Sequence, residues 1–282
     1  MSEKWKLLLK NWKFQRKKNS FGKFTKGIIY DTANGIISMP HDDMMIGKRL
    51  STEGAWNLKE IDLLKKIIHK EDVVYVVGTH VGTLLIPLSK HCRNIVGYEA
   101  NPETFWFLKQ NLTMNEVTNA EIFNLAIGDH KKSISFLMNK MNTGGSKIKP
   151  VKDIFKYRFD APKEIEIPMI SLDEHILEKD LQPPNGIIMD IEGAEFFALQ
   201  GMPKTLKEIR FLYMEYVPHH LKNVSATTKE QLFELLKPYF ARAVSSRKNI
   251  EFDLSRSPAE FLKYLDELEA FERVDDILFL KT

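Results

Sequence analysis

The sequence predicts an α/β fold with a mostly parallel sheet, and two features of its 282 residues support this prediction. Residues 72–101 contain a β-branched apolar run, a glycine turn, a helical stretch and a second apolar run that is closed by Glu99. Short apolar runs joined by a helix are typical of buried parallel strands. Further along the chain, strand-like runs alternate with helix-like patterns, as a sheet covered by helices on both faces requires.

The N-terminal residues have a pattern of their own. Trp5, Leu8, Leu9 and Trp12 are spaced at i, i+3, i+4 and i+7, which places them on one face of a helix with lysines on the other face. Such a helix can lie on an anionic membrane surface. Alternatively, the two tryptophans can pack on the body of the protein while the lysines are solvated, and the pattern allows both interpretations.

A hairpin and a helix are expected next. Two apolar runs within residues 27–39 flank Asn34 and Gly35, a pair that favours a turn with positive φ. Asn57 followed by Glu60 three residues later resembles a capping box, so a helix should begin here and continue to about residue 69. Glu60 is therefore interpreted as a helix cap and not as a ligand.

The remaining elements follow from the same patterns. After the second strand, Asn101 and Pro102 should cap and begin a helix. Pro168 indicates that its strand lies at the edge of a sheet, because proline has no N–H for a ladder. Beyond the helix we expect strands over 121–127, 133–138, 165–170, 186–191, 211–217, 240–245 and 277–280, with helices after 171, over 228–236 and over 257–271.

Composition and charge restrict the function classes. Cys92 is the single cysteine, so no internal disulfide can form, and the sequence suits a reducing, cytoplasmic location. No apolar run reaches about 18 residues, so no spanning helix is expected, and we also expect no signal peptide. Residues 1–26 carry nine Lys or Arg and one acid, a charge of +8 within a total of +3, which leaves −5 for the rest. A nucleic-acid partner is therefore not expected for the body, whereas the basic segment allows peripheral contact with the inner face of a membrane.

The glycine turn predicts a ligand that contains adenosine. Glycines at 78 and 82 allow backbone amides to approach a ligand closely, and Glu99 at the next strand tip can hold both ribose hydroxyls. His80 and Thr83 occupy two positions where a dinucleotide fingerprint needs glycine, which disfavours a nucleotide-dependent oxidoreductase. The turn suits a ligand without a pyrophosphate, such as S-adenosylmethionine, although a plain strand–helix–strand crossover would give the same pattern.

Several segments together carry a family resemblance, over about residues 43–218. In order they read VVGTHVG, YEANPETFWFLKQNL, NLAIGD, NTGGS, ISLDEHI, IIMDIEGAEFFALQGM and FLYMEY. The chain resembles the FkbM-type S-adenosylmethionine-dependent methyltransferases. The resemblance implies a class I, Rossmann-like fold with a mostly parallel seven-stranded sheet whose final strand is antiparallel. It also implies O-methylation of a hydroxyl on a sugar, glycan or related small molecule.

Two domains are expected, and the resemblance implies cofactor-binding residues in the second. Residues 1–70 would form a basic helix, a hairpin and a lead-in helix, and residues 71–282 the methyltransferase domain. In this fold an acid at the third strand tip commonly binds the adenine amino group, a role that passes to Asp129. The expected cofactor-binding residues are Gly78, Thr79, His80, Gly82, Glu99, Ala100, Asn101, Gly128, Asp129 and Asp190.

The catalytic prediction concerns the DIEGAE segment. Asp190 and Glu192 follow a predicted central strand, and the carboxyl ends of parallel strands are where open α/β sheets bind ligands. A methyltransferase that acts on a hydroxyl benefits from a general base. The candidates, in order, are Asp190, Glu192 and His219. Glu192 and Glu195 could instead only complement the dipole of the following helix.

The acceptor is expected near two further segments. The NTGGS stretch is interpreted as a mobile lid or acceptor loop, and the strand over 211–217 ends near two adjacent histidines. Neighbouring side chains rarely face the same ion, so we expect no metal. The predicted acceptor-binding residues are Gly144, Gly145, Ser146, Glu215 and His220.

Two positions depart from the family pattern and leave a rival hypothesis open. Val76 stands where the family usually has an acid at the end of the first strand, and His80 stands where it usually has Asn. A protein that binds the cofactor but no longer catalyses methyl transfer is the alternative that these departures allow.

Overall fold

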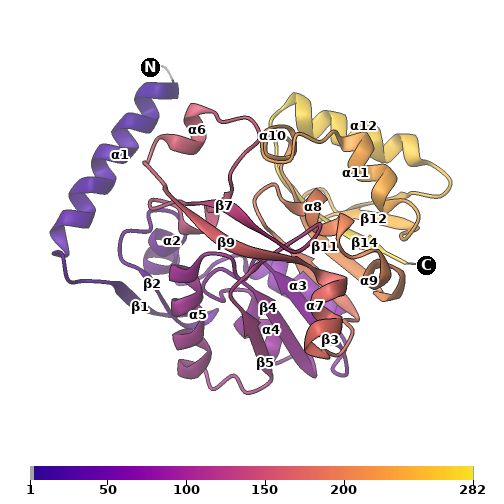
Figure 1. The fold of residues 1–282 in the computed structure, drawn as a ribbon, viewed down its shortest axis with the longest axis horizontal. Helices are drawn as coiled ribbons and strands as arrows, with labels where there is room; N and C mark the ends of the chain where they lie inside the picture. Colours follow the sequence, from indigo (N-terminus) through magenta and orange to yellow (C-terminus); the bar gives the residue numbers. More distant parts are fainter. Residues whose placement is uncertain (1–2, 282) are drawn as a thin grey trace.

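A computed structural model describes residues 3–281 and contains an eight-stranded sheet with helices on both faces (Figure 1). β3 to β5 and β10 to β11 are parallel, and β14 runs antiparallel to β11, as the sequence predicts for the final strand. In spatial order the strands are β13 (Ile250–Asp253), β12 (Arg242–Ser245), β14 (Asp275–Leu280), β11 (Phe211–Tyr216), β10 (Gly186–Met189), β3 (Val73–Val77), β4 (Asn94–Tyr98) and β5 (Ala120–Phe123).

The count of seven strands is wrong by one. After β12 the chain turns through residues 246–249 and returns as β13, which pairs antiparallel with β12 from Ser245 and Ile250 to Arg242 and Asp253. The short segment 250–253 has two exposed residues, one buried and one half-buried, so it lacks the alternation by which a strand is found in a sequence. It extends the sheet at the edge farthest from β5.

The strand predicted over 121–127 is in fact two strands in two sheets. β5 ends at Phe123, and the Asn124 amide then donates hydrogen bonds to the carbonyls of Glu99 (2.7 Å) and Ala100 (3.3 Å). These side-chain hydrogen bonds take the place of the next backbone hydrogen bonds between β4 and β5, so β5 ends and the chain leaves the sheet. It re-enters a second, four-stranded sheet ordered β6 (Ala126–Gly128), β9 (Lys163–Ser171), β7 (Lys132–Met138) and β8 (Lys147–Ile148).

The expectation that the strand containing Pro168 lies at a sheet edge is also wrong. β9 is an inner strand between β6 and β7. Proline is accommodated because β6 pairs with β9 only from Met169 onward, so Pro168 has a neighbouring strand on one side, where Ser133 is its partner.

The expected hairpin is present and packs on the main body. β1 (Gly27–Thr32) and β2 (Gly35–Pro40) pair antiparallel around Asn34 and Gly35. The backbone N–H and the hydroxyl of Ser38 both donate to Asn111 Oδ1, at 2.7 and 2.6 Å, which ties β2 to helix α5 (Pro102–Met114). The hairpin contributes to the same core as β3 and β4. The division into two domains at residue 70 stays a prediction.

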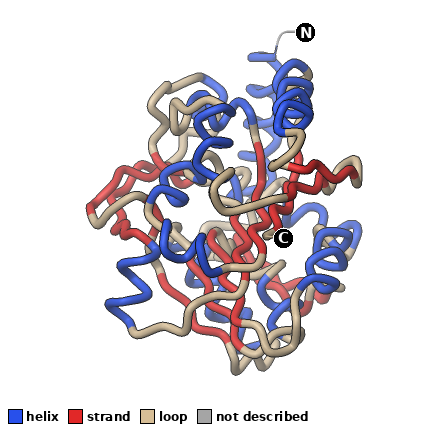
Figure 2. Tube along the Cα trace, turned by 90° about the vertical axis from the view of Figure 1, so that its right-hand side faces the viewer, coloured by secondary structure: helices blue, strands red, loops and turns tan. Residues whose placement is uncertain are grey.

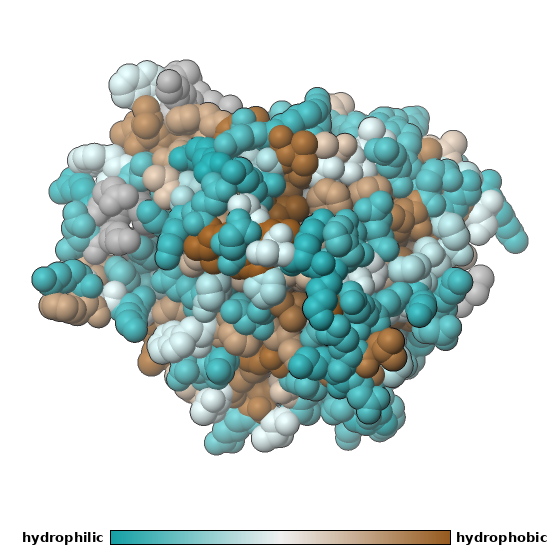
Figure 3. All heavy atoms as spheres, in the orientation of Figure 1, coloured by the Kyte–Doolittle hydropathy of each residue, from teal (hydrophilic) through white to brown (hydrophobic). Residues whose placement is uncertain are grey.

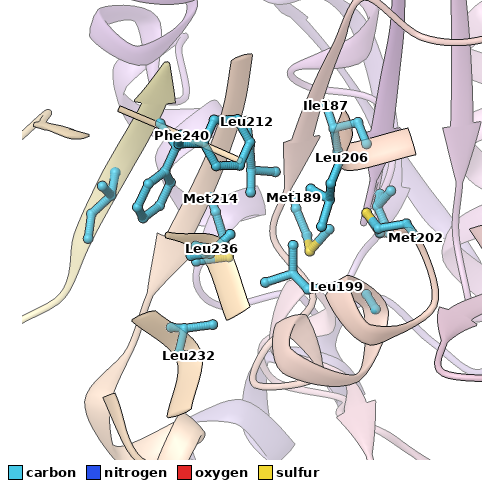
Figure 4. Close-up of a cluster of buried hydrophobic side chains, with 14 of the residues drawn as sticks. Ile187, Met189, Leu199, Met202, Leu206, Leu212, Met214, Leu232, Leu236 and Phe240 are labelled. Carbon is cyan, nitrogen blue, oxygen red and sulfur yellow. The ribbon is translucent and has the colours of Figure 1, made fainter. Parts of the chain in front are cut away.

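Two apolar layers cover the sheet, one on each face. On one face lie the hairpin and the helices α2 (Ile46–Glu53), α3 (Leu58–Ile67), α4 (Leu85–Ser89) and α5. Figure 4 shows part of the opposite layer, where Met189 and Met214 of the sheet meet Leu199 and Leu236 from helices. That layer is formed by α7 (Leu172–Lys179), α8 (Glu195–Gln200), α9 (Pro203–Glu208), α10 (Pro218–Asn223), α11 (Lys229–Leu236) and α12 (Pro258–Ala270).

The N-terminal helix α1 (Glu3–Ser20) lies at one edge of the molecule, apart from the main sheet (Figures 1 and 2). The Asn11 amide donates to the carbonyl of Phe159 at 3.1 Å, a contact between α1 and the loop before β9. Trp5 is 63% exposed and Trp12 is 55% exposed. The alternative in which the two tryptophans pack on the body is therefore wrong.

The visible surface is mostly hydrophilic, with hydrophobic residues in smaller groups (Figure 3). Among the described residues, no helix combines the length and the apolar character that crossing a bilayer requires.

Candidate active site

A cavity of about 230 Å³ opens at the carboxyl ends of the central strands, where the strand order reverses between β3 and β10. Of the residues that the sequence predicts for the site, this cavity is lined by Gly78, Thr79, His80, Glu99, Ala100, Gly144, Ser146, Asp190, Glu192 and Glu215. The predicted residues outside its lining are Gly82, Asn101, Gly128, Asp129, Gly145, His219 and His220.

The turn after β3 can be formed only by glycine at position 78. Gly78 has a φ of 91°, and a Cβ there would lie 1.8 Å from the carbonyl oxygen of Asp190. The N–H groups of Gly78 and Thr79 both donate to the carbonyl of Tyr98, at 2.9 and 3.1 Å. The turn is thus fixed against β4 and β10, and it brings the backbone to the cavity surface.

Glu99 at the end of β4 is buried and held by three internal donors. Its Oε2 accepts from the backbone N–H of His80 at 2.6 Å. Its Oε1 accepts from the Asn101 N–H and from the Thr104 hydroxyl, both at 2.9 Å. Burial raises the pKa of Glu99, and these three hydrogen bonds oppose that rise. A carboxylate offers about four acceptor sites, so one is left for a ligand in the cavity.

His80 connects the turn to the NTGGS loop. It has a φ of 50°, a left-handed conformation that Asn and His adopt more readily than most residues. The Thr143 hydroxyl donates to Asp43 Oδ2 at 2.7 Å, so the contact of 2.7 Å to His80 Nε2 requires the ring to donate. Burial lowers the pKa of His80 to about 4, which keeps the ring neutral at pH 7.

The NTGGS loop is anchored, contrary to the expectation of a mobile lid. Asp43 accepts from both the N–H and the hydroxyl of Thr143, at 2.9 and 2.7 Å. The Ser146 hydroxyl donates to the carbonyl of Thr143 at 2.7 Å and accepts from Asn101 Nδ2 at 3.3 Å. Residues Thr143–Gly145 form one turn of 3₁₀ helix. Gly144 and Ser146 face the cavity from this fixed position, while Gly145 lies behind them.

Asp190 and Glu215 lie at the ends of β10 and β11 and face the cavity. Neither carboxylate has a hydrogen bond or an ion pair with another residue among residues 3–281. Burial raises the pKa of both groups well above the usual value, and the neighbouring charge of Glu192 raises each pKa further. Asp190 nevertheless has accessible surface, because the cavity reaches it.

Glu192 differs from these two acids because it has a partner. Its Oε2 lies 3.2 Å from Lys147 Nζ, and the Lys147 side chain is only 4% exposed. His220 Nδ1 lies 3.1 Å from the same oxygen but has no hydrogen-bond geometry, and burial lowers the pKa of this ring so that it stays neutral. Glu192 therefore holds a buried lysine and is less available as a base than Asp190.

His219 begins helix α10 outside the cavity lining. Its ring stacks on Tyr157 at 6.5 Å and lies 4.2 Å from the His220 ring. Burial, followed by the charges of Lys156 and Lys147, lowers its pKa to about 4. It is a neutral imidazole at pH 7, one residue away from the group that contacts Glu192.

The assignment of Asp129 to adenine rested on a strand tip that does not exist. Asp129 follows β6 of the second sheet and forms surface ion pairs with Lys132 at 3.1 Å and His130 at 3.0 Å. Its predecessor Gly128 packs against Met169, which lies 2.2 Å from where a Cβ would be. The cavity is lined instead by Leu125, just before this strand, and by Ala126, its first residue.

Asn101 and Gly82 support the site from behind. The Asn101 side chain accepts from the Glu103 N–H at 2.9 Å and caps α5, as expected. Gly82 packs against Leu108 of the same helix, 2.8 Å from where a Cβ would be. Both positions hold α5 close to the turn without lining the cavity.

The sequence interpretation missed Glu60. The Asn57 side chain caps no N–H; its amide donates to Glu60 Oε2 at 2.8 Å, and both residues line the cavity. A signal was available, because Glu60 lies one helical turn before Leu64 and next to Ile61, on the edge of the buried face. Within the part of the chain that the structure describes, no three His, Cys, Asp or Glu side chains are arranged to hold a metal ion.

A switch point between β3 and β10, a glycine turn and an acid at the end of the next strand together define a class I methyltransferase. The chain belongs to the methyltransferase FkbM domain family, which matches residues 77–267, and it is a methyltransferase.

Relatives are similar over part of their length. The hexuronic acid methyltransferase AglP of Haloferax volcanii is 26% identical over 174 residues, 58% of this chain and 67% of that protein. The 2-O-methyltransferase NoeI of Sinorhizobium fredii is 28% identical over 134 residues, 44% of this chain and 54% of that protein. A crystal structure of methyltransferase FkbM from Methylobacillus flagellatus is 16% identical with a TM-score of 0.36, over 54% of this chain and 34% of that chain.

Proposed function

We propose that this protein transfers a methyl group from S-adenosylmethionine to a hydroxyl group of a sugar or glycan. The observation that carries the proposal is the position of Asp190, an unpartnered carboxylate in a cavity that is also lined by the glycine turn and Glu99. A binding surface for adenosine and a base for a hydroxyl thus share one space.

The residues present fit the cofactor. Glu99 has an acceptor site left toward the cavity, which suits ribose hydroxyls as donors. The close approach of Gly78 to Asp190 leaves backbone, not a side chain, at the cavity wall. Leu125 and Ala126 offer apolar surface beside Glu99 for an adenine ring. The family resemblance implies the same donor.

The chain has to orient the acceptor and remove its proton. When bound, the cofactor supplies an activated methyl group on a sulfonium. The carboxylate of Asp190 would accept the hydroxyl proton as the acceptor oxygen takes up the methyl group, and the products would be a methyl ether and S-adenosylhomocysteine. Asp190 acts as a base in its ionised form, and its raised pKa makes that form a stronger proton acceptor.

The relatives guide the choice of acceptor. One is named for the methylation of a hexuronic acid and the other for methylation at a 2-O position. Carboxylates that accept from hydroxyl groups are available here at Glu215 and Asp190, which face the cavity together. We infer that a sugar hydroxyl is the acceptor.

Incubation with methyl-labelled S-adenosylmethionine tests this function. Fractionated glycans, hexuronate-containing saccharides and lipids are offered, and the expected product is a labelled sugar ether that withstands alkaline hydrolysis. Label found only as an ester or an amine would contradict O-methylation of a sugar hydroxyl.

The rival hypothesis of a protein that binds without turnover makes a different prediction. Val76 is buried against Ile188 of β10, so the position of the usual acid belongs to the apolar core here. If catalysis has lapsed, S-adenosylhomocysteine raises the melting temperature but no labelled product forms with any fraction. An oxidoreductase would be stabilised by NADH instead.

We propose in addition that α1 contacts the inner face of a membrane from the cytoplasm. Trp5, Leu8, Leu9 and Trp12 are all exposed, and the neighbouring lysines carry the charge that an anionic surface attracts.

A further inference from the structure

Glu60 is the part of the cavity whose chemistry the proposed function leaves unexplained. It projects from the first turn of α3 into the cavity, and its Oε2 accepts from the Asn57 amide at 2.8 Å. Within residues 3–281 it has no contact with a lysine or arginine. Burial raises its pKa to about 8, and the nearby charge of Asp276 contributes to that rise.

The neighbourhood of Glu60 is acidic on every element that packs there. Asp276 lies on β14, and Asp190 on β10 is within electrostatic range of both Glu60 and Asp276. Glu215 on β11 faces the same cavity, deep in the molecule, and has no hydrogen-bond or ion-pair partner among the described residues. The charge of Glu60 also raises the pKa of the Tyr213 hydroxyl. Among the described residues, no lysine or arginine pairs with Glu60, Asp190 or Glu215, so a cationic ligand group would relieve their mutual repulsion.

The strand that packs against α3 supplies no charge at Val76. Val76 at the end of β3 belongs to the core layer that also contains Ile61 and Leu64 of α3. Since Val76 and Glu60 both line the cavity, the helix brings a carboxylate to a place where the strand offers only apolar surface.

The order of the strands indicates which part of a bound cofactor would lie near Glu60. Glu99 on β4 suits the ribose, and Leu125 beyond β5 suits the adenine. Continuing along the sheet in the other direction, β3 and β10 come next, so a cofactor held in this way would extend its amino-acid moiety toward the Gly78 turn, Asp190 and α3. That moiety ends in an ammonium group.

We propose that Glu60 binds the ammonium group of the cofactor's amino-acid moiety, with Asn57 as the positioning residue that holds the carboxylate; this inference rests on the proposed function. Asn57 has a φ of 49° and a ψ of 38°, a left-handed conformation that directs its amide to Glu60 instead of capping the helix.

Two ligands separate this role from a structural one. S-adenosylhomocysteine has the ammonium group, whereas 5′-methylthioadenosine has the same adenosine and sulfur without the amino-acid moiety. Calorimetry with Glu60→Gln should show affinity for S-adenosylhomocysteine reduced about tenfold or more, because a charge-assisted hydrogen bond is lost. Its affinity for 5′-methylthioadenosine should equal that of the unaltered protein.

Asp62→Asn is the matched control, since it removes an exposed carboxylate from the same helix. It should change neither affinity. Equal losses for both ligands in Glu60→Gln, or no loss for either, would overturn the assignment of Glu60 while leaving the proposed function intact. Failure of the unaltered protein to bind S-adenosylhomocysteine at all would overturn both.

Discussion

The carboxylates at the two ends of the cavity differ in how many hydrogen bonds they accept from the protein. Glu99 at one end accepts three hydrogen bonds from the protein, two of them from backbone N–H groups. Asp190 and Glu215 at the other end have none within the described chain, and Glu60 has one, from a neutral amide. Glu99 is thus held in place before a ligand binds, whereas the carboxyl groups of Glu60, Asp190 and Glu215 have no cationic partner among the described residues.

This difference shows how one site can combine a fixed anchor with reactive groups. An acid that accepts several internal hydrogen bonds is held in one geometry. Acids that repel one another keep protons near neutral pH and can exchange them during catalysis. The first three predictions below each change one end of the cavity, and the fourth changes neither.

The largest effect is expected for Asp190→Asn. The substitution keeps the shape of the side chain but removes the base, so turnover should fall by about 10²- to 10⁴-fold. Affinity for S-adenosylhomocysteine should change by only a few-fold, because the group acts on the acceptor oxygen in the transition state. Labelled-methyl kinetics and calorimetry on the same preparation measure both quantities. Turnover at the original rate would remove Asp190 from the mechanism and move the role to Glu192 or His219.

Glu99→Ala should have the next largest effect, and on affinity. Loss of hydrogen bonds from a ribose to a charged acceptor costs about 1.5 to 3 kcal/mol each, so binding of S-adenosylhomocysteine should weaken about 100-fold. The His80 and Asn101 N–H groups also lose their acceptor. The melting temperature of the ligand-free protein should therefore fall by several degrees. Asp129→Ala serves as the control, because its carboxylate lies in surface ion pairs, and it should leave affinity unchanged.

Glu215→Gln should stabilise the ligand-free protein, whereas Glu99→Ala should destabilise it. The pKa of Glu215 is raised in the folded state by burial and then by Asp190, so the folded protein retains a proton that the unfolded chain has released. Stability is therefore lost as pH rises above the usual range of a glutamate. Glutamine removes this loss, and the gain in melting temperature, a few degrees, should be larger at pH 8 than at pH 5. A lower melting temperature at pH 8 would show that Glu215 is paired.

The smallest effect on stability is expected when α1 is deleted. Among the described side chains, a protein that starts at Phe21 loses the hydrogen bond from Asn11 to the body, and it should melt within about one degree of the full chain. It should no longer sediment with anionic vesicles that retain the full-length protein at low salt, since that attraction is screened as salt rises. Absence of retention of the full-length protein at low salt would exclude the membrane contact.

The fixed end of the site follows from local sequence, and the acidic end does not. Gly78 and Glu99 are recognisable because a glycine turn and a strand-tip acid have a set spacing along the chain. The hairpin at Asn34 and the caps at Asn101 and Thr228 are local in the same way.

Glu60 reaches the cavity only through packing between segments far apart in sequence. Its spacing from Asn57 fits a capping box as well as it fits the contact observed. The packing of α3 near β10, β11 and β14 determines that Glu60 lines the cavity and does not cap the helix.

The misplaced strand has a similar origin. Residues 121–127 look like one strand, but hydrogen bonds from Asn124 to the carbonyls of residues 99 and 100 divide it and move Asp129 away from the site. A side chain that replaces a backbone hydrogen bond of the sheet does not change the apolar pattern of the sequence, so the break cannot be predicted from that pattern.

The central claim, that one end of the cavity holds protons which a bound cation displaces, is tested most directly by the proton balance of binding. At pH 7 the ligand-free Glu60 carboxyl, with its pKa of about 8, is largely protonated, and a bound ammonium group favours its ionised form. Titration with S-adenosylhomocysteine in two buffers of different ionisation enthalpy should therefore show net proton release, and Glu60→Gln should reduce that release. Equal binding enthalpies in both buffers, or net proton uptake, would contradict the account.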